Sequence, residues 1–239
     1  MPVMLITGAT SGIGEALARH AVSKGYTVLL TGRRLERLKA LKDEFGEAAL
    51  IGQLDVTKPE EAWQVVESLA KESGGIDIAI LNSGVSNFQG GFTPETEQWV
   101  IDVNVSGFVQ TANRFFTYFE ERGSGQIVGI SSVAGMFGYG LSAAYCASKA
   151  FVSNYMQGLR QRARRSKASI SVTDIRPGFV ESEMTAGKKG MFWVVPADYA
   201  AVRLLNAVEA QKSRAFIPRR WALIGLLITL TPNRFLDRL

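Results

Sequence analysis

The chain has 239 residues, of which 46% are hydrophobic and 21% charged, as in an ordinary globular protein. Its one cysteine and one histidine exclude an intramolecular disulfide and a Cys/His metal cluster, although a carboxylate metal site stays open. The net charge is +5, but the densest basic run, at 160–167, holds no aromatic residues, so we interpret it as a solvated helix end rather than a nucleic-acid surface.

The chain opens on a Met-Pro pair and an apolar run, with no basic segment ahead of a long apolar one. We therefore expect no signal peptide and a cytoplasmic protein. From there, short apolar runs alternate with segments of helical periodicity. The predicted strands are Val3–Thr7, Thr27–Thr31, Ala49–Leu54, Ile76–Asn82, Gln126–Ser131 and Ser169–Arg176. The predicted helices are Gly14–Lys24, Glu36–Phe45, Pro59–Ser73, Glu95–Glu121, Ser142–Arg165 and Pro196–Gln211.

The predicted strands are nearly continuous in apolar character, which is typical of parallel strands covered on both faces. Their regular alternation with helices favours right-handed βαβ units. We therefore predict an α/β fold: a doubly wound, Rossmann-like parallel sheet with helices on both faces. One domain is expected to span 1–239, with an apolar C-terminal segment at 219–239.

The first predicted strand leads into a glycine-rich turn and then into a helix. Glycines at such a turn let the backbone approach a pyrophosphate, and the helix N-terminus supplies N–H donors and a positive dipole end. The spacing is Gly-x-x-x-Gly-x-Gly, and no Gly-Lys-Ser/Thr follows, which argues against a P-loop. We predict a dinucleotide site whose residues here are Gly8, Thr10, Ser11, Gly12, Ile13 and Gly14.

The end of the second predicted strand indicates which dinucleotide binds. An acidic residue there would accept hydrogen bonds from the ribose of NAD and repel a 2′-phosphate. Here Gly32 takes that place, and Arg33 and Arg34 follow it. Guanidinium groups bind phosphate through paired, charge-assisted hydrogen bonds. We predict NADP(H), with Arg33 on the 2′-phosphate and Arg34 as a helper, while NAD(H) is less favoured. The alternative is two solvated loop arginines.

Tyr145 and Lys149 are four residues apart in a predicted helix, so their side chains share one face. A free phenol, with a pKa near about 10, is a poor acid or base at neutral pH. A nearby ammonium would stabilise the phenolate and lower that pKa. The pair alone is common on protein surfaces.

Together with the glycine-rich turn, this pair makes the sequence similar to the short-chain dehydrogenase/reductase family over roughly 3–218. The matching segments, in the family's order, are Thr7–Gly14, Asp55-Val56, Asn82-Ser83-Gly84, Asn104, Ser131-Ser132, Tyr145–Lys149 and Pro177-Gly178. The resemblance implies an oxidoreductase that moves a hydride between a nicotinamide cofactor and a carbonyl or secondary alcohol.

The resemblance also implies catalytic roles. Tyr145 would protonate the carbonyl oxygen during reduction, and Lys149 would lower the phenol pKa and hydrogen-bond the nicotinamide ribose. Ser132 would hold the substrate oxygen and is preferred over Ser131, because the family uses the second serine of this pair. Asn104 would hold a water that links Lys149 to bulk solvent.

Three further segments are implied to touch the cofactor, besides Tyr145 and Lys149. Asp55 and Val56 resemble the adenine contacts. The loop of Asn82, Ser83 and Gly84 partly matches the family's Asn-Asn-Ala-Gly, which contacts the adenosine ribose. The third segment resembles the one that binds the nicotinamide carboxamide, with serine where the family has threonine; its implied contacts are Pro177, Gly178, Val180 and Ser182.

Apolar residues lie on both sides of the predicted catalytic tyrosine in the chain. They are Met136, Phe137, Tyr139, Met184, Met191, Phe192 and Trp193, and Phe88 is a further candidate. Hydride transfer needs a site from which water is largely excluded. We therefore predict a lipophilic or aromatic substrate; the alternative is that these residues pack the core or a subunit contact.

The last apolar run, 221–230, follows Arg219 and Arg220 and is closed by Pro232. Its ten residues are too few to span a bilayer, which takes about twenty. Three interpretations stay open: a helix in the interface of a homodimer or homotetramer, a flap over the substrate pocket, or a peripheral membrane contact through 219–230.

A non-catalytic, cofactor-sensing binding protein on the same fold is the rival to the enzyme, because a fold does not fix a function. Such a protein needs neither Tyr145 nor Lys149, and this chain has both. The enzyme is therefore favoured.

Overall fold

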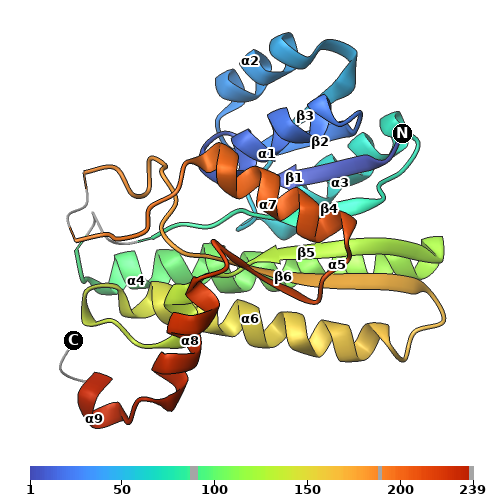
Figure 1. Cartoon of the computed structure of the whole chain (residues 1–239). Coiled ribbons are helices and arrows are strands. Elements are labelled where there is room, and N and C mark those ends of the chain that lie inside the picture. The colour runs from blue at the N-terminus through green and yellow to red at the C-terminus, as the bar shows by residue number, and fades with distance from the viewer. Residues whose placement is uncertain (87–90, 188–189, 237–239) are drawn as a thin grey trace.

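The computed structural model describes residues 1–86, 91–187 and 190–236 (Figure 1). Seven strands form one sheet in the order β3-β2-β1-β4-β5-β6-β7, and every neighbouring pair is parallel. The strands are β1 (Val3–Thr7), β2 (Thr27–Gly32), β3 (Ala49–Gln53), β4 (Ile78–Leu81), β5 (Ser124–Ile130), β6 (Ser169–Pro177) and β7 (Arg214–Ile217). The strand order reverses between β1 and β4, which is the topological switch point where such sheets bind ligands. The predicted doubly wound fold is confirmed.

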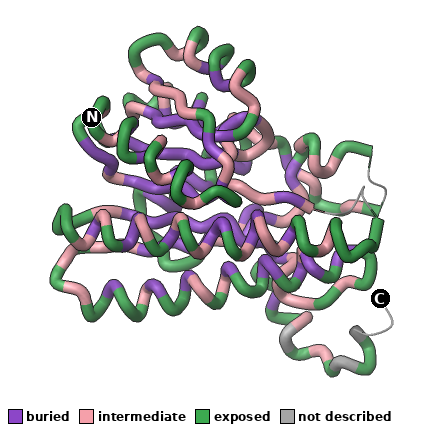
Figure 2. The backbone as a smooth tube through the Cα atoms, turned by 180° about the vertical axis from the view of Figure 1, so that it is seen from behind, coloured by how far each residue is buried: buried purple, intermediate pink, exposed green. Residues whose placement is uncertain are grey.

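Helices cover both faces of the sheet (Figure 1). One face is covered by α1 (Gly12–Ser23), α2 (Leu35–Phe45) and α7 (Ala197–Glu209). The other is covered by α3 (Pro59–Ser73), α4 (Pro94–Ile101), α5 (Phe108–Arg122) and α6 (Ala143–Ala163). Each layer encloses its own apolar core. Figure 2 shows the buried strands between helices whose outer sides are exposed.

The core between the sheet and helices α3 to α6 depends on aromatic residues of α5. Phe115, Phe116 and Phe119 are fully buried, and Phe119 stacks on Phe115 at 5.9 Å between ring centroids. The ring of Phe119 also lies on β5, where a Cβ at Gly125 would come within 2.0 Å of it. Glycine at 125 therefore lets α5 approach the sheet closely, which sets the distance between the helix and the strand.

The predicted helix 95–121 is wrong in one respect, because it is not continuous. A π-helical turn at Asp102–Gly107 separates α4 from α5. Its last residue lies against the loop after β3, and a Cβ at Gly107 would be 2.8 Å from Val56 Cγ2. Such turns are frequent at functional sites, and this one carries Asn104.

The end of the chain holds one strand that was not predicted and two short helices. The edge strand β7 was missed, because its four residues begin with an exposed arginine and give no apolar run. The apolar segment after it forms α8 (Trp221–Leu230), followed by α9 (Asn233–Leu236). None of the described helices is long and apolar enough to cross a membrane.

Replacing Phe119 with alanine is expected to lower the free energy of unfolding by about 3–5 kcal/mol, because a fully buried ring leaves a cavity. Phe92, whose side chain is 69% exposed, provides the matched control, and Phe92→Ala should change stability by less than about 0.5 kcal/mol. Urea unfolding followed by circular dichroism measures both values. Equal stability of the two variants would contradict the core described for α5.

Candidate active site

The glycine-rich turn between β1 and α1 has an unusual backbone conformation that hydrogen bonds hold in place. Gly8 and Gly12 have positive φ angles of 66° and 54°, which favour glycine. A Cβ at Gly14 would lie 2.4 Å from the carbonyl oxygen of Gly8. The Asn82 side-chain amide donates to the carbonyls of Thr7 and Gly8, at 3.1 and 3.0 Å. The turn therefore exposes backbone where a side chain would otherwise stand, which suits a pyrophosphate.

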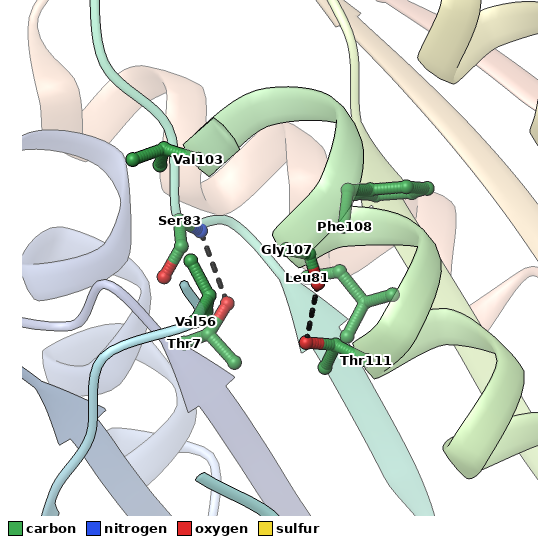
Figure 3. A pocket seen from close by; sticks show the side chains of 8 residues that line it. All are labelled: Thr7, Val56, Leu81, Ser83, Val103, Gly107, Phe108 and Thr111. Carbon is green, nitrogen blue, oxygen red and sulfur yellow. Dashed lines mark hydrogen bonds between the residues drawn. The ribbon is translucent and has the colours of Figure 1, made fainter. Parts of the chain in front are cut away.

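The loop after β4 lies directly beside this turn. The hydroxyl of Thr7 accepts hydrogen bonds from the backbone N–H groups of Asn82 and Ser83, both at 3.0 Å. Ser83 and Val56 line one small pocket, together with Thr7 and residues of the π-turn and α5 (Figure 3). The structure thus brings the start of the turn predicted to hold the pyrophosphate together with two distant segments predicted to contact the adenosine.

The end of β2 presents arginine to the same region. The Arg34 guanidinium donates to Thr10 Oγ1 from Nε at 3.0 Å and to the Thr10 carbonyl from Nη2 at 2.9 Å. Arg33 is exposed, and its carbonyl accepts from Gln53 Nε2 at 2.9 Å. A Cβ at Gly32 would lie 3.1 Å from Thr10 Cγ2, so the position of an NAD-type acid is crowded. The predicted arginines and Thr10 therefore lie together.

The predicted catalytic residues converge where β5 meets α6. Ser132 Oγ donates to the Pro177 carbonyl at 3.3 Å, accepts from the Ala134 N–H at 3.1 Å, and is hydrogen-bonded to Tyr145. Lys149 Nζ lies 5.8 Å from the centroid of the Tyr145 ring and donates to the Ile130 carbonyl at 3.0 Å. The side chains of serine, tyrosine and lysine therefore face one small volume.

Burial governs the acidity of this pair. It raises the pKa of Tyr145 to about 12, although the hydrogen bond with Ser132 acts in the opposite direction. It lowers the pKa of Lys149 to about 8, against the attraction of the buried Asp174 carboxylate. Desolvation of the phenolate thus dominates the pKa of Tyr145 in the structure, and the lowering of that pKa by Lys149 stays a prediction. A neutral phenol is a proton donor, as carbonyl reduction requires.

Asn104 ties the loop after β4 to α6. Its Oδ1 accepts from the Val85 N–H at 2.8 Å, and its Nδ2 donates to the Val85 carbonyl at 2.9 Å and to Ser148 Oγ at 3.0 Å. A Cβ at Gly84 would lie 3.2 Å from Lys149 Nζ and 3.4 Å from Asn104 Oδ1. The amide thus positions the loop close to the lysine, and its role in holding a water stays a prediction.

The segment after β6 lies over the glycine-rich turn. A Cβ at Gly12 would be 3.1 Å from the Cβ of Ser182. The Ser182 N–H donates to Thr185 Oγ1 at 3.0 Å, and that hydroxyl donates to the Val180 carbonyl at 2.7 Å. Asp55, in contrast, caps its own turn by accepting from the N–H of Thr57 at 3.0 Å. The nicotinamide and adenine ends of the predicted site therefore lie on either side of the turn.

A model of the short chain dehydrogenase family matches residues 2–191. The chain belongs to this family. A relative from Myxococcus xanthus, named an uncharacterized oxidoreductase, is 35% identical over 98% of this chain and 94% of its own length. An NADP-dependent 3-hydroxy acid dehydrogenase from Salmonella typhi is 38% identical over 74% of this chain and 72% of its own. A short-chain dehydrogenase from Sphingobium yanoikuyae, solved with NADPH, superposes with a TM-score of 0.80 at 31% identity and covers 97% of both chains.

A buried charge network beneath the short-chain dehydrogenase site was missed from the sequence. Asp174 of β6 is fully buried; it accepts from Ser131 Oγ at 2.5 Å and from Arg176 Nε at 2.7 Å. An aspartate and an arginine two residues apart in an otherwise apolar strand were the available signal, since such side chains point to one face. The network fixes Ser131, the residue before the predicted catalytic serine, Ser132.

An aromatic cluster adjoins the Pro177-Gly178 turn. Its members are Phe179, Phe192, Trp193 and Trp221, with ring centroids 5.1 to 6.0 Å apart in the contacting pairs. A Cβ at Gly178 would lie 1.9 Å from Trp221 Nε1, and a Cβ at Gly225 would meet Met136 Sδ at 2.6 Å. The helix α8 therefore packs beside the Pro177-Gly178 turn. A contact of this kind is what the interpretation of this segment as a flap over the substrate pocket expects. Phe88 lies outside the described residues.

Leucines on the other side of α8 are exposed: Leu223, Leu226, Leu227 and Leu230. No group of three or more metal-ligating His, Cys, Asp or Glu side chains occurs in the described part of the chain.

Carbonyl reduction is expected to slow about tenfold per unit as the pH rises above about 8, the pKa to which burial lowers Lys149. Below that pH the amine holds its proton; above it the amine is neutral and no longer stabilises the phenolate that Tyr145 becomes on donating its proton. Initial rates at saturating substrate, measured from pH 6 to 10, test this. Lys167→Arg, a change at an exposed lysine, should keep the break, and a flat profile would contradict the assignment.

Proposed function

We propose that this protein is an NADP(H)-dependent oxidoreductase that transfers a hydride between the cofactor and a carbonyl or secondary alcohol of lipophilic character. The observation that carries the proposal is the convergence of Ser132, Tyr145 and Lys149 beside the Pro177 carbonyl. Bound NADP(H) supplies or accepts the hydride. The glycine-rich turn fits such a group, because Gly8 and Gly12 take positive φ angles and α1 begins at Gly12 without a side-chain cap, which leaves the N–H groups of its first turn to a phosphate.

The residues of the chain supply the proton and hold the substrate. During reduction the neutral Tyr145 phenol donates its proton to the substrate oxygen, and the Ser132 hydroxyl orients that oxygen by a hydrogen bond. The Lys149 ammonium then stabilises the phenolate at short range, inside a region where charges interact strongly. During oxidation the same groups work in reverse, with the phenolate as base.

NADP(H) is preferred over NAD(H) on the grounds of charge and space. Arg34 lies on Thr10 of the glycine-rich turn, and Gly32 leaves no carboxylate to repel a 2′-phosphate. Arg33 stays exposed beside it and completes a basic edge. The relatives point the same way, since one is named as NADP-dependent and another was solved with NADPH.

A lipophilic substrate is supported by the aromatic cluster and by Met136, which line the side of the catalytic turn that faces α8. A carboxylate-bearing substrate is the second candidate. The observation that favours it is Arg220, whose guanidinium carbon lies 4.6 Å from the centroid of the Trp193 ring. The 3-hydroxy acid dehydrogenase among the relatives agrees with it. A homo-oligomer, a membrane contact through 219–230, a cytoplasmic location and the one-domain span stay predictions.

Replacing Tyr145 with phenylalanine is expected to lower kcat by about 10²- to 10⁴-fold, because the phenol is the proton donor, while the Kd for NADPH changes less than twofold. Tyr155→Phe on the same helix is the matched control and should keep both values; its ring packs against Phe108 and Phe151 instead. Absorbance of NADPH measures turnover, and fluorescence titration measures binding. Equal turnover of wild type and Tyr145→Phe would favour the cofactor-sensing binding protein.

An aromatic or long-chain ketone is expected to show a kcat/KM at least about tenfold above that of a small sugar. The reason is that burial of apolar substrate surface against the aromatic cluster and Met136 is favourable. Paired 3-oxo acids and their methyl esters separate the two candidates. If the acid is preferred and Arg220→Gln abolishes the preference, the substrate carries a carboxylate. Faster turnover of sugars than of either class would contradict both.

A further inference from the structure

Glu183 extends from the segment after β6 to the arginines that follow β2. Its Oε2 lies 2.7 Å from Arg34 Nη1, and its other carboxylate oxygen pairs with Arg37. Both arginines also bind the glycine-rich turn, since Arg34 donates to Thr10 Oγ1 at 3.0 Å and Arg37 donates to the Thr10 carbonyl at 3.2 Å. One carboxylate thus bridges two guanidinium groups at the edge of the turn, 149 residues away from Arg34 in sequence.

The charge state of Glu183 follows from these partners. The hydrogen bonds from Arg34 and Arg37 hold the pKa of Glu183 below its usual range, so the side chain is an anion at neutral pH. A carboxylate and a phosphate present the same kind of oxygen pair to a guanidinium fork. Glu183 therefore occupies donors of the kind that a 2′-phosphate would use.

From this geometry we infer that Glu183 is a cofactor-selecting residue, whose carboxylate competes with the 2′-phosphate of NADP(H) for Arg34 and Arg37. The inference rests on the proposed function, in which that phosphate binds next to Thr10. A 2′-phosphate carries nearly two negative charges and repels a neighbouring carboxylate. The Arg34 Nη1 that donates to Glu183 would therefore be released before it can donate to the phosphate.

The competition acts on one cofactor only. NAD(H) has a neutral hydroxyl at the 2′ position and needs no guanidinium there, so its binding leaves the Glu183 ion pairs in place. The carboxylate is a tethered competitor with a high effective concentration, and it lowers the advantage that the arginines give to NADP(H). Glu183 also belongs to the same short segment as Ser182, which lies over Gly12. Release of Glu183 from the arginines would therefore free one attachment of this segment to the glycine-rich turn.

Binding of adenosine 2′,5′-bisphosphate and of adenosine 5′-monophosphate, measured by calorimetry, tests the inference without any substrate. Glu183→Gln keeps the size of the side chain and removes its charge. It should bind the bisphosphate about three- to tenfold more tightly than wild type, as expected for the loss of two exposed ion pairs, and bind the monophosphate within about twofold. Glu181→Gln is the matched control in the same segment; its exposed carboxylate makes no ion pair with the described residues, and its affinities should equal those of wild type.

The outcomes separate this inference from the function on which it rests. If wild type prefers the bisphosphate but Glu183→Gln binds it equally or more weakly, Glu183 is no competitor, and the proposed cofactor still stands. If wild type binds both nucleotides equally, the predicted 2′-phosphate site and the inference fail together. Tighter binding by Glu181→Gln as well would show a general effect of charge and would also overturn the inference.

Discussion

The Lys149 ammonium is buried in the interior, and much of the site depends on how its charge is tolerated there. Taking an ammonium out of water costs several kcal/mol unless polar groups replace the lost solvent. The Ile130 carbonyl at the end of β5 accepts its hydrogen bond, and the Asp174 carboxylate on the neighbouring strand attracts it. Both groups depend on the pairing of β5 with β6, so the sheet that carries the fold also keeps a cation next to the phenol.

The parallel sheet explains why distant segments meet at this point. Ser132 follows β5, Pro177 ends β6, and the glycine-rich turn follows β1; all are at the same edge because parallel strands end on the same side. The hydrogen bond between Ser132 and the Pro177 carbonyl joins the proton-donating side of the site to the segment that carries Ser182 and Glu183. The proposed acid–base group and the proposed cofactor-selecting carboxylate therefore both depend on the end of β6.

The sequence predicted the doubly wound fold, and six of the seven strands of its sheet, because those signals are local. Apolar runs, glycine spacing and the Tyr-x-x-x-Lys pair can each be recognised within a few residues. The π-turn at Asp102–Gly107 escaped, since it depends on the approach of Gly107 to Val56 from another strand. The ion pairs of Glu183 escaped for the same reason.

The pKa of Tyr145 depends on surroundings that the sequence does not show. Helical spacing shows that a lysine is near, but only packing shows how far both groups are desolvated. Asp174 was likewise invisible as a partner of Ser131, because β5 and β6 pair only in the folded protein. What the sequence could not supply was thus the surroundings of each site residue rather than its identity.

The contact between Gly178 and the indole of Trp221 has a consequence for how this enzyme diversifies. The wall beside the catalytic turn is built by α8, a helix outside the doubly wound sheet that touches it through a few side chains. Exchange of α8 for another sequence would change the apolar surface beside the Pro177-Gly178 turn while the strands and the glycine-rich turn stay as they are. The proposed substrate-contacting surface and the proposed acid–base residues therefore lie on different elements. Any replacement for α8 has to pack against Gly178.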